Sequence, residues 1–148
     1  MTPSSTENKD IQEVGDFFNA YAEKFSSIYE EDDQKRGWFD SLMDRWFRQA
    51  IYTRFKFTLE QTAKSSIQSV LDIGCGPGHY SVAFLEQGKT VTAIDLAQDM
   101  LRLTQSRVDA TGHGERFTSL HGDYMSLELE EQADAACVMG VFDYVADP

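Results

Sequence analysis

The chain has 148 residues, 41% of them hydrophobic, and a formal net charge of −12. This length suits one domain with its own hydrophobic core and is too short for two. The negative charge argues against a nucleic-acid partner, because a protein that binds phosphates needs a basic surface. The composition therefore predicts a single globular domain that does not bind nucleic acid.

The start of the chain lacks the features of a targeting segment. Residues 1–9 are polar, without the basic-then-apolar order of a secretory signal. No apolar run approaches the roughly 20 residues that would span a bilayer. We therefore expect a disordered lead-in at residues 1–9 and a cytoplasmic protein without a membrane span. The two cysteines, Cys75 and Cys137, lie in apolar or glycine-rich surroundings and predict reduced thiols rather than a disulfide or a metal site.

Residues 10–65 predict an aromatic-rich helical segment. Apolar residues recur at spacings of three and four from residue 10 to about residue 31, and again from Trp38 to about Ala63. We expect this segment to form a lid over a bound small molecule; the alternative is simple packing against the rest of the domain. The candidate lid contacts are Tyr21, Phe25, Tyr29 and Trp38.

A local basic patch lies within this segment. Between Lys35 and Lys56 the chain carries six basic residues and only two acidic ones. One interpretation is the solvated face of a helix. The other is a patch that attracts an anionic small substrate, and the sequence leaves both open.

Residues 66–148 predict an α/β domain. Short apolar strands alternate with helical patterns, the strands at residues 67–73, 90–94, 117–121 and 133–141 and the helices at residues 80–87 and 98–108. Such alternation predicts a doubly wound parallel sheet with helices on both faces. The fourth strand is uncharged from Ala135 onward, which predicts burial on both of its faces.

The sequence V-L-D-I-G-C-G-P-G-H, residues 70–79, joins the first strand to a helix through a glycine-rich turn. Closely spaced glycines let the backbone approach a ligand, and the helix that follows presents free N–H groups. A dinucleotide-binding fingerprint needs glycine or alanine where this chain has His79. Asp72, just before the turn, suits a ligand with an ammonium group better than a pyrophosphate. Both features favour S-adenosylmethionine over NAD.

Two further aspartates follow strands of the predicted sheet. Asp95 ends the second strand, where a carboxylate can accept hydrogen bonds from both hydroxyls of a ribose; the alternative is a cap for the helix that starts near Ala97. Asp123 follows the third strand and is a candidate acceptor for an adenine amino group, with Leu96 and Met100 packing on the base. Its alternative role is that of a turn-forming residue after a glycine.

Residues 66–148 resemble the class I, Rossmann-like methyltransferases that use S-adenosylmethionine. The resemblance lies in V-L-D-I-G-C-G-P-G for the glycine loop, T-A-I-D at the second strand end, H-G-D-Y after the third strand and C-V-M-G-V-F-D-Y in the fourth. It implies that the glycines line the methionine part of the cofactor, that Asp72 steadies its amino group and that Gly140 lies beneath the sulfonium. The full set of cofactor-binding residues that it implies is Asp72, Gly74, Cys75, Gly76, Gly78, Asp95, Leu96, Met100, Asp123, Tyr124 and Gly140.

The resemblance further implies methyl transfer to a small-molecule acceptor by in-line displacement, in which the protein mainly aligns the acceptor with the methyl group. Candidate bases are Asp143, Tyr144 and His79; the first two are alternatively substrate contacts, and the third a helix-capping or surface residue. G-V-F-D-Y after the fourth strand differs from the N/D-P-P-Y type element of enzymes that methylate nucleic-acid bases. Together with Arg54-Phe55, the F-D-Y triplet resembles magnesium-protoporphyrin-type O-methyltransferases.

The family resemblance implies a sheet in the order 3-2-1-4-5-7-6, whereas the sequence predicts only the strands 3-2-1-4. We therefore expect a truncated form of a longer protein, with the closing strands and much of the acceptor pocket missing. The alternative function is a non-catalytic or incomplete module that binds the cofactor without transferring a methyl group. Asp72 and His79 disfavour a nicotinamide oxidoreductase. The sequence predicts neither the acceptor, nor the atom methylated, nor the oligomeric state.

Overall fold

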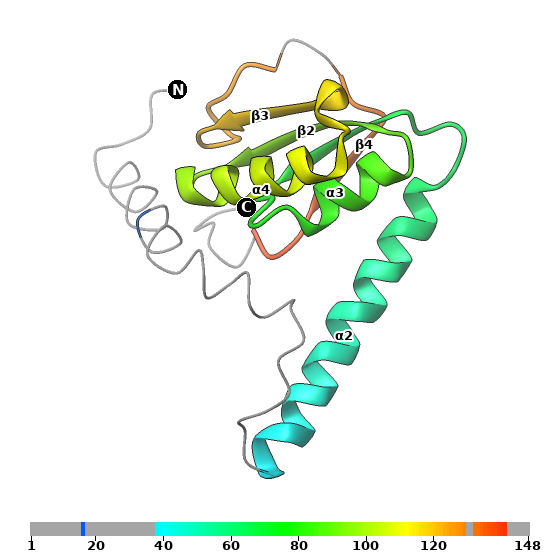
Figure 1. Cartoon of the computed structure of the whole chain (residues 1–148), viewed down its shortest axis with the longest axis vertical. Coiled ribbons are helices and arrows are strands. Elements are labelled where there is room, and N and C mark those ends of the chain that lie inside the picture. Colours follow the sequence, from blue (N-terminus) through cyan, green and yellow to red (C-terminus); the bar gives the residue numbers. More distant parts are fainter. Residues whose placement is uncertain (1–15, 17–37, 130–131, 142–148) are drawn as a thin grey trace.

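The computed structural model describes residue 16, residues 38–129 and residues 132–141 (Figure 1). The elements in chain order are α2 (Trp38–Thr62), β1 (Ser69–Ile73), α3 (His79–Glu86), β2 (Thr90–Asp95), α4 (Gln98–Thr111), the 3₁₀ turn η1 (Gly114–Arg116), β3 (Phe117–His121) and β4 (Ala135–Val138). The predicted lead-in, all but one residue of the first predicted helix, and three lid candidates lie outside the described residues; these candidates are Tyr21, Phe25 and Tyr29.

The four strands form one parallel sheet in the order β3-β2-β1-β4, as the sequence predicts. The chain leaves β1 toward β2 on one side, and after β3 it crosses to the other side of β1 to form β4. In parallel α/β sheets such a reversal opens a crevice at the carboxyl ends of the strands, where ligands bind. The loop after β1, residues 74–78, therefore begins at the switch point of the sheet.

The main hydrophobic core lies between the sheet and the helices α3 and α4. Val70 of β1 and Val91 of β2 are paired in register and pack with Phe84 and Leu85 of α3 and Val108 of α4. Figure 1 shows α3 and α4 side by side in front of the sheet. Because the described helices that cover the sheet lie on this face, the second helical layer of a doubly wound sheet stays a prediction.

The opposite face of the sheet carries a separate apolar cluster. Its buried members are Leu71, Ile73 and Ile94, and leucines from β3 and the chain after it pack against them. Residues of β1 alternate between the two faces, so Val70 and Asp72 point to the α3 side and Leu71 and Ile73 to the other. This alternation puts the Asp72 carboxyl under the start of α3.

The fourth strand differs from the sequence prediction. β4 covers only Ala135–Val138, and Ala136 is exposed whereas Cys137 is buried. The prediction of burial on both faces is therefore wrong for this strand as the described residues show it. The physical reason is position: β4 pairs with β1 on one side only and forms an edge of the described sheet, whereas an uncharged run is buried on both faces only in a sheet interior.

The last turns of α2 are fixed to the α/β domain. Phe55 and Leu59 pack on the main core, with the Phe55 and Tyr80 ring centroids 4.9 Å apart. Gln87, after α3, accepts a hydrogen bond from Thr62 Oγ1 at 2.9 Å and donates one to the Leu59 carbonyl, also at 2.9 Å. The earlier turns of α2 extend away from the sheet (Figure 1). These contacts attach the helical segment without testing its predicted role as a lid.

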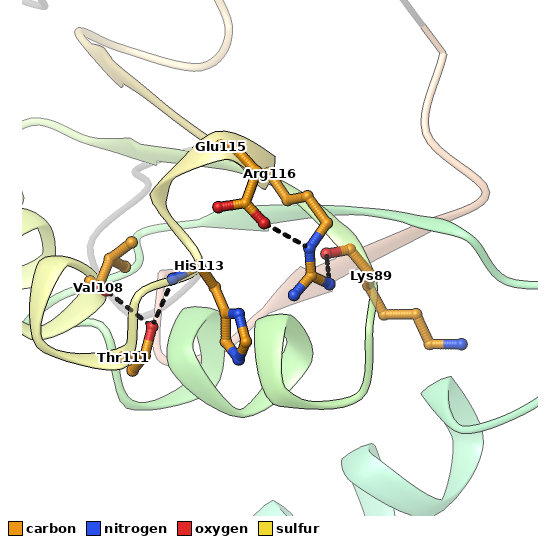
Figure 2. A network of polar contacts seen from close by, with 6 residues as sticks. All are labelled: Lys89, Val108, Thr111, His113, Glu115 and Arg116. Atoms are coloured by element: carbon orange, nitrogen blue, oxygen red, sulfur yellow. Dashed lines mark hydrogen bonds and ion pairs between the residues drawn. The ribbon is translucent and has the colours of Figure 1, made fainter.

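The amino end of the sheet is closed by polar contacts between connecting segments (Figure 2). Arg116 donates to the Lys89 carbonyl at 3.3 Å and pairs with Glu115 at 3.3 Å. Thr111 Oγ1 donates to the Val108 carbonyl at 2.7 Å. The bond from Arg116 to Lys89 joins the α4–β3 connection to the α3–β2 connection, and the other two order the α4–β3 connection itself, at the opposite end of the strands from the glycine loop.

Candidate cofactor site

The glycine loop, residues 74–78, has three residues in the left-handed region. The φ angles are 66° for Gly74, 52° for Gly76 and 83° for Gly78, a region that side chains strongly disfavour. A methyl group on Gly78 would come within 2.6–2.9 Å of the Thr104 side chain, and one on Gly74 would meet Val141. A methyl on Gly76 would meet no heavy atom within 4 Å. Packing thus excludes a side chain at the first and third glycines, while the second borders open space.

Both polar backbone groups of Gly76 are held by side chains. Its N–H donates to Asp95 Oδ2 at 2.8 Å, and its carbonyl accepts from Thr104 Oγ1 at 2.8 Å. The other oxygen of Asp95 accepts from the Ala97 N–H at 2.9 Å. The carboxylate at the end of β2 therefore connects the glycine loop to the turn that enters α4.

Asp95 does not act as the helix cap that the sequence left open. Ala97 is the N-cap residue of α4, and no side chain caps the helix. The bond from the Ala97 N–H instead orders the turn before the helix. Burial raises the pKa of Asp95, whereas the backbone hydrogen bonds from Ala97 and Gly76 lower it. The carboxylate is thus a partly desolvated acceptor at the centre of the carboxyl edge.

Asp72 is a second, more deeply buried carboxyl group beneath the loop. It is 2% exposed, and its Oδ2 accepts a hydrogen bond of 2.6 Å from the hydroxyl of buried Ser81 on α3. Burial, together with the charge of Asp95, raises its pKa to about 6, although the Ser81 hydrogen bond acts to lower it. Two neighbouring acids that disfavour each other's charge make this edge attractive to a cation.

The end of β3 lies beside Asp95, because His121 is its register partner. The Gly122 N–H donates to the Asp95 carbonyl at 3.1 Å, and His121 Nε2 is 2.9 Å from the Leu96 carbonyl. Asp123 Oδ1 accepts from the Met125 N–H at 3.1 Å. Asp123 therefore does act as the turn-forming residue that was its alternative role. Its other carboxylate oxygen receives no hydrogen bond from the described residues.

The remaining predicted cofactor residues divide into accessible and buried ones. Tyr124 is 40% exposed, Leu96 is half-buried and Gly140, with φ 75°, is exposed at the end of β4. Cys75 is 7% exposed and Met100 1% exposed, and both pack in core clusters. The side chains of both residues lie in the core, and the contact with the cofactor that the family resemblance implies for them stays a prediction.

Of the three candidate bases, the structure describes only His79. Asp143 and Tyr144 lie outside the described residues. His79 begins α3, and its ring nitrogens lie 3.0 and 3.1 Å from Arg107 Nη1 on α4. A guanidinium can only donate, so the nitrogen that it faces must be unprotonated. Gly78 is the N-cap residue of α3 and no side chain caps that helix, so His79 does not take the capping role, and its role as a base stays a prediction. Among the residues that the structure describes, no cluster of side chains could hold a metal ion.

Two residues of the site were missed in the sequence. Ser81 and Thr104 are each 0% exposed and hold Asp72 and Gly76, respectively. A signal was present: both are polar residues on the buried face of a helix, among apolar neighbours. A buried hydroxyl needs a hydrogen-bond partner, and the nearest polar groups are those of the glycine loop and the strand before it.

The arrangement defines a Rossmann-like α/β domain with a candidate ligand site at the carboxyl edge of its sheet. Residues 70–148 match the methyltransferase domain family, and the chain belongs to that family. It is 31% identical over 81 residues to the ubiquinone biosynthesis O-methyltransferase of Pseudomonas fluorescens strain Pf0-1, a match that covers 55% of this chain and 35% of the relative. The chain therefore spans about a third of the length of the curated relatives that it matches.

Solved structures show the same fold. A methyltransferase from Thiobacillus denitrificans in complex with S-adenosyl-L-homocysteine is 26% identical, with a TM-score of 0.53 over 61% of this chain and 37% of that one. The magnesium protoporphyrin IX methyltransferase of Synechocystis PCC 6803 is 20% identical, with a TM-score of 0.62 over 86% of this chain and 57% of that one. No helix among the described residues has the length and apolar character needed to cross a bilayer.

Proposed function

We propose that this chain binds S-adenosylmethionine at the carboxyl edge of its sheet and belongs to an enzyme that transfers the methyl group to a small-molecule acceptor. The observation that carries the proposal is the geometry of Gly76. Its N–H and carbonyl are both fixed by side chains, and its α-carbon borders open space. A backbone held in this way provides a rigid wall that a ligand can approach closely.

Each part of S-adenosylmethionine would have a group of described residues beside it. Gly74, Gly76 and Gly78 would line the methionine part, with Asp72 toward the ammonium group. Gly140, exposed at the end of β4, would lie beneath the sulfonium. These positions follow the switch point between β1 and β4, where the crevice of such a sheet lies.

The ribose and adenine would lie over β2 and β3. Each oxygen of Asp95 accepts one hydrogen bond within the chain and retains a lone pair for a ribose hydroxyl. Asp123 retains an oxygen for the adenine amino group, and Leu96 and Tyr124 are accessible for contact with the base. Cys75 and Met100 would support this site from the core rather than contact the cofactor.

Charge separates this ligand from a dinucleotide. Asp72, Asp95 and Asp123 place three carboxyl groups around the loop, and burial disfavours the negative charge on the first two. A sulfonium with an ammonium group relieves that cost, whereas a pyrophosphate adds to it. The Thiobacillus denitrificans relative, crystallised with the demethylated product, supports the same choice.

The bound cofactor supplies an activated methyl carbon, and the chain supplies alignment. In an in-line displacement a lone pair of the acceptor forms the new bond to the methyl carbon as the carbon–sulfur electron pair returns to sulfur. The O-methyltransferase named above supports an oxygen acceptor for this protein, and the basic residues between Lys35 and Lys56 would suit an anionic group on it. Residues 10–65 as a lid, Asp143 and Tyr144 as acceptor contacts, and a cytoplasmic location remain predictions.

Calorimetry on the whole chain tests the cofactor. We expect S-adenosylmethionine and S-adenosylhomocysteine to bind with a stoichiometry of one, and NAD not to bind at the same concentrations. Circular dichroism on the same sample would establish that the chain is folded. A folded chain that binds NAD, or that binds none of the three, would refute the proposed site.

A further inference from the structure

Thr104 is a polar residue in an apolar position. It lies on the buried face of α4, whose other buried residues are Met100, Leu101 and Val108, and is itself 0% exposed. A hydroxyl group that is buried without a hydrogen-bond partner destabilises the fold. An apolar residue would satisfy the packing of the helix, so the hydroxyl calls for a separate explanation.

The hydroxyl of Thr104 is bonded to the glycine loop. Its Oγ1 donates to the Gly76 carbonyl at 2.8 Å and lies 3.7 Å from Cys75 Sγ. Cys75 Sγ also donates to the Gly76 carbonyl, at 3.6 Å. Burial raises the pKa of the Cys75 thiol, so it stays protonated and can donate at neutral pH. The Thr104 hydroxyl and the Cys75 thiol thus meet at the same carbonyl of the loop, and the hydroxyl makes the shorter bond.

The side chain also fills the space where a side chain on Gly78 would lie. Thr104 Cγ2, Oγ1 and Cβ are 2.6, 2.7 and 2.9 Å from the position of a Cβ on that glycine. The loop therefore lies directly against Thr104 at two of its three glycines. Asp95 accepts from the N–H of Gly76, whereas Thr104 donates to the carbonyl of the same residue.

We propose that Thr104 is a positioning residue for the cofactor: its hydroxyl and Asp95 together hold Gly76 in the conformation that receives the ligand. The inference rests on the proposed function. It also gives α4 a specific part in the site, because Asp95 orders the entry to this helix through the Ala97 N–H while Thr104 extends from its second turn. A ligand that binds Asp95 would therefore act on a loop already fixed from α4.

Three variants test the proposal. Thr104→Val keeps the shape of the side chain and removes the hydroxyl, whereas Thr104→Ser keeps the hydroxyl. Thr62→Val is the matched control, because Thr62 is also buried, at 6% exposure, and its hydroxyl bonds Gln87 at the junction of α2 with α3. Affinity for S-adenosylhomocysteine is measured by calorimetry at a temperature where all variants are folded, together with their unfolding by denaturant.

We expect Thr104→Val to raise the Kd about tenfold, the loss expected for about one hydrogen bond. Thr104→Ser should stay within about threefold of the wild type, since the bond to Gly76 is retained. Thr62→Val should lower stability and leave the Kd unchanged. An unchanged Kd in Thr104→Val, or an equal loss in Thr62→Val, would overturn the inference while leaving the proposed function intact. A folded wild-type chain that fails to bind the probe would instead refute the proposed function itself.

Discussion

An aspartate binds two backbone N–H groups at each end of the sheet. At the carboxyl end, Asp95 accepts from Gly76 and Ala97 at 2.8 and 2.9 Å. At the amino end, one oxygen of Asp134 accepts from the N–H groups of residues 68–69, also at 2.8 and 2.9 Å. Each clamp accepts from two backbone N–H groups at the same distances, and Asp134 also accepts from the Ser69 hydroxyl at 3.1 Å. The two carboxyl groups nevertheless have pKa shifts in opposite directions.

The difference lies in burial. Backbone hydrogen bonds lower the pKa of Asp134, which is exposed, whereas burial outweighs them and raises the pKa of Asp95. A structural clamp is thus placed where water solvates its charge. At the carboxyl end, the negative charge of Asp95 costs free energy to bury, and the buried carboxyl group of Asp72 is close enough to be affected by it. Such unrelieved charge is typical of a site that awaits a cationic ligand.

The largest expected effect on ligand affinity comes from replacing the aspartate of each clamp by alanine. Asp95→Ala removes the acceptor proposed for the ribose hydroxyls, and we expect the Kd for S-adenosylmethionine to rise between about tenfold and a hundredfold. Asp134→Ala should lower stability and leave the Kd within about twofold. Calorimetry on both folded variants makes the comparison. Equal losses of affinity would show that the two ends are not functionally distinct.

The ribose contact can be separated from the support that Asp95 gives to Gly76. An S-adenosylhomocysteine analogue without the 2′-hydroxyl should bind the wild type more weakly than the parent ligand. In Asp95→Ala the two ligands should bind alike, because the hydroxyl has lost its partner. Additive losses would contradict a direct contact between Asp95 and the ribose.

Asp72→Asn should change stability in a pH-dependent way. The pKa of Asp72 is raised from 3.8 to about 6 in the folded chain, so the unfolded chain ionises first and folding loses stability as pH rises between about 4 and 6. The substitution removes that loss. Its effect on the free energy of unfolding should be more favourable by about 2 kcal/mol at pH 7.5 than at pH 4. Urea titrations at both pH values measure this difference.

For the same variant, we expect the affinity for the ligand to change in the opposite direction to the stability. If Asp72 attracts the ammonium group of the ligand, Asp72→Asn should bind S-adenosylmethionine less well at pH 7.5 while being more stable there. The hydrogen bond from Ser81 can persist, because the amide oxygen still accepts. A variant that gains stability and keeps its affinity would assign Asp72 to the structure alone.

A matched pair of glycines has a smaller expected effect. Gly76 and Gly88 have φ angles of 52° and 82°, and a methyl group on either would meet nothing closer than 3.9 Å. Substitution by alanine should lower the stability by about 1–2 kcal/mol in each case. Only Gly76→Ala should also weaken ligand binding, because its methyl would enter the space proposed for the cofactor. Equal binding by the two variants would show that this space is not used.

Asp134→Asn should show the smallest effect, in acid stability. The folded pKa of Asp134 is lowered, so its charge stabilises the fold above the unfolded pKa of 3.8, and this contribution is lost as pH falls through the folded value. The variant should therefore differ from the wild type at pH 7 and converge with it as pH falls below 3.8 and through the folded pKa. Thermal melts across that range follow the convergence. A constant offset would mean that the charge contributes nothing.

Sequence reasoning was sufficient where a local pattern determines a local structure. Glycines at 74, 76 and 78 predicted a tight turn after a strand, and the structure has this turn, with all three glycines at positive φ. Alternating periodicities predicted the four strands, and the bounds of β3 agree with the prediction, while the order of the strands was what the family resemblance implied. The prediction also placed Asp95 at the end of β2, where the structure has it.

It was insufficient where a side chain's role depends on tertiary contacts. The inward orientation of Met100 and Cys75 follows from how α4 packs on the sheet, and a spacing pattern does not determine that packing. Ser81 and Thr104 bind groups 9 and 28 residues away in the chain. The exposure of Ala136 depends on which strands flank β4, which its own composition does not reveal.

Amide NMR with added S-adenosylhomocysteine tests the central claim most directly, because it reports both ends of the sheet at once. We predict that the shifts change at the glycine loop, at residues 95–97 and at residues 122–125. The amides of residues 68–69 and 88–90 at the amino end should stay in place. Changes confined to the amino end, or none in a folded chain at saturating ligand, would contradict the assignment of the carboxyl edge as the cofactor site.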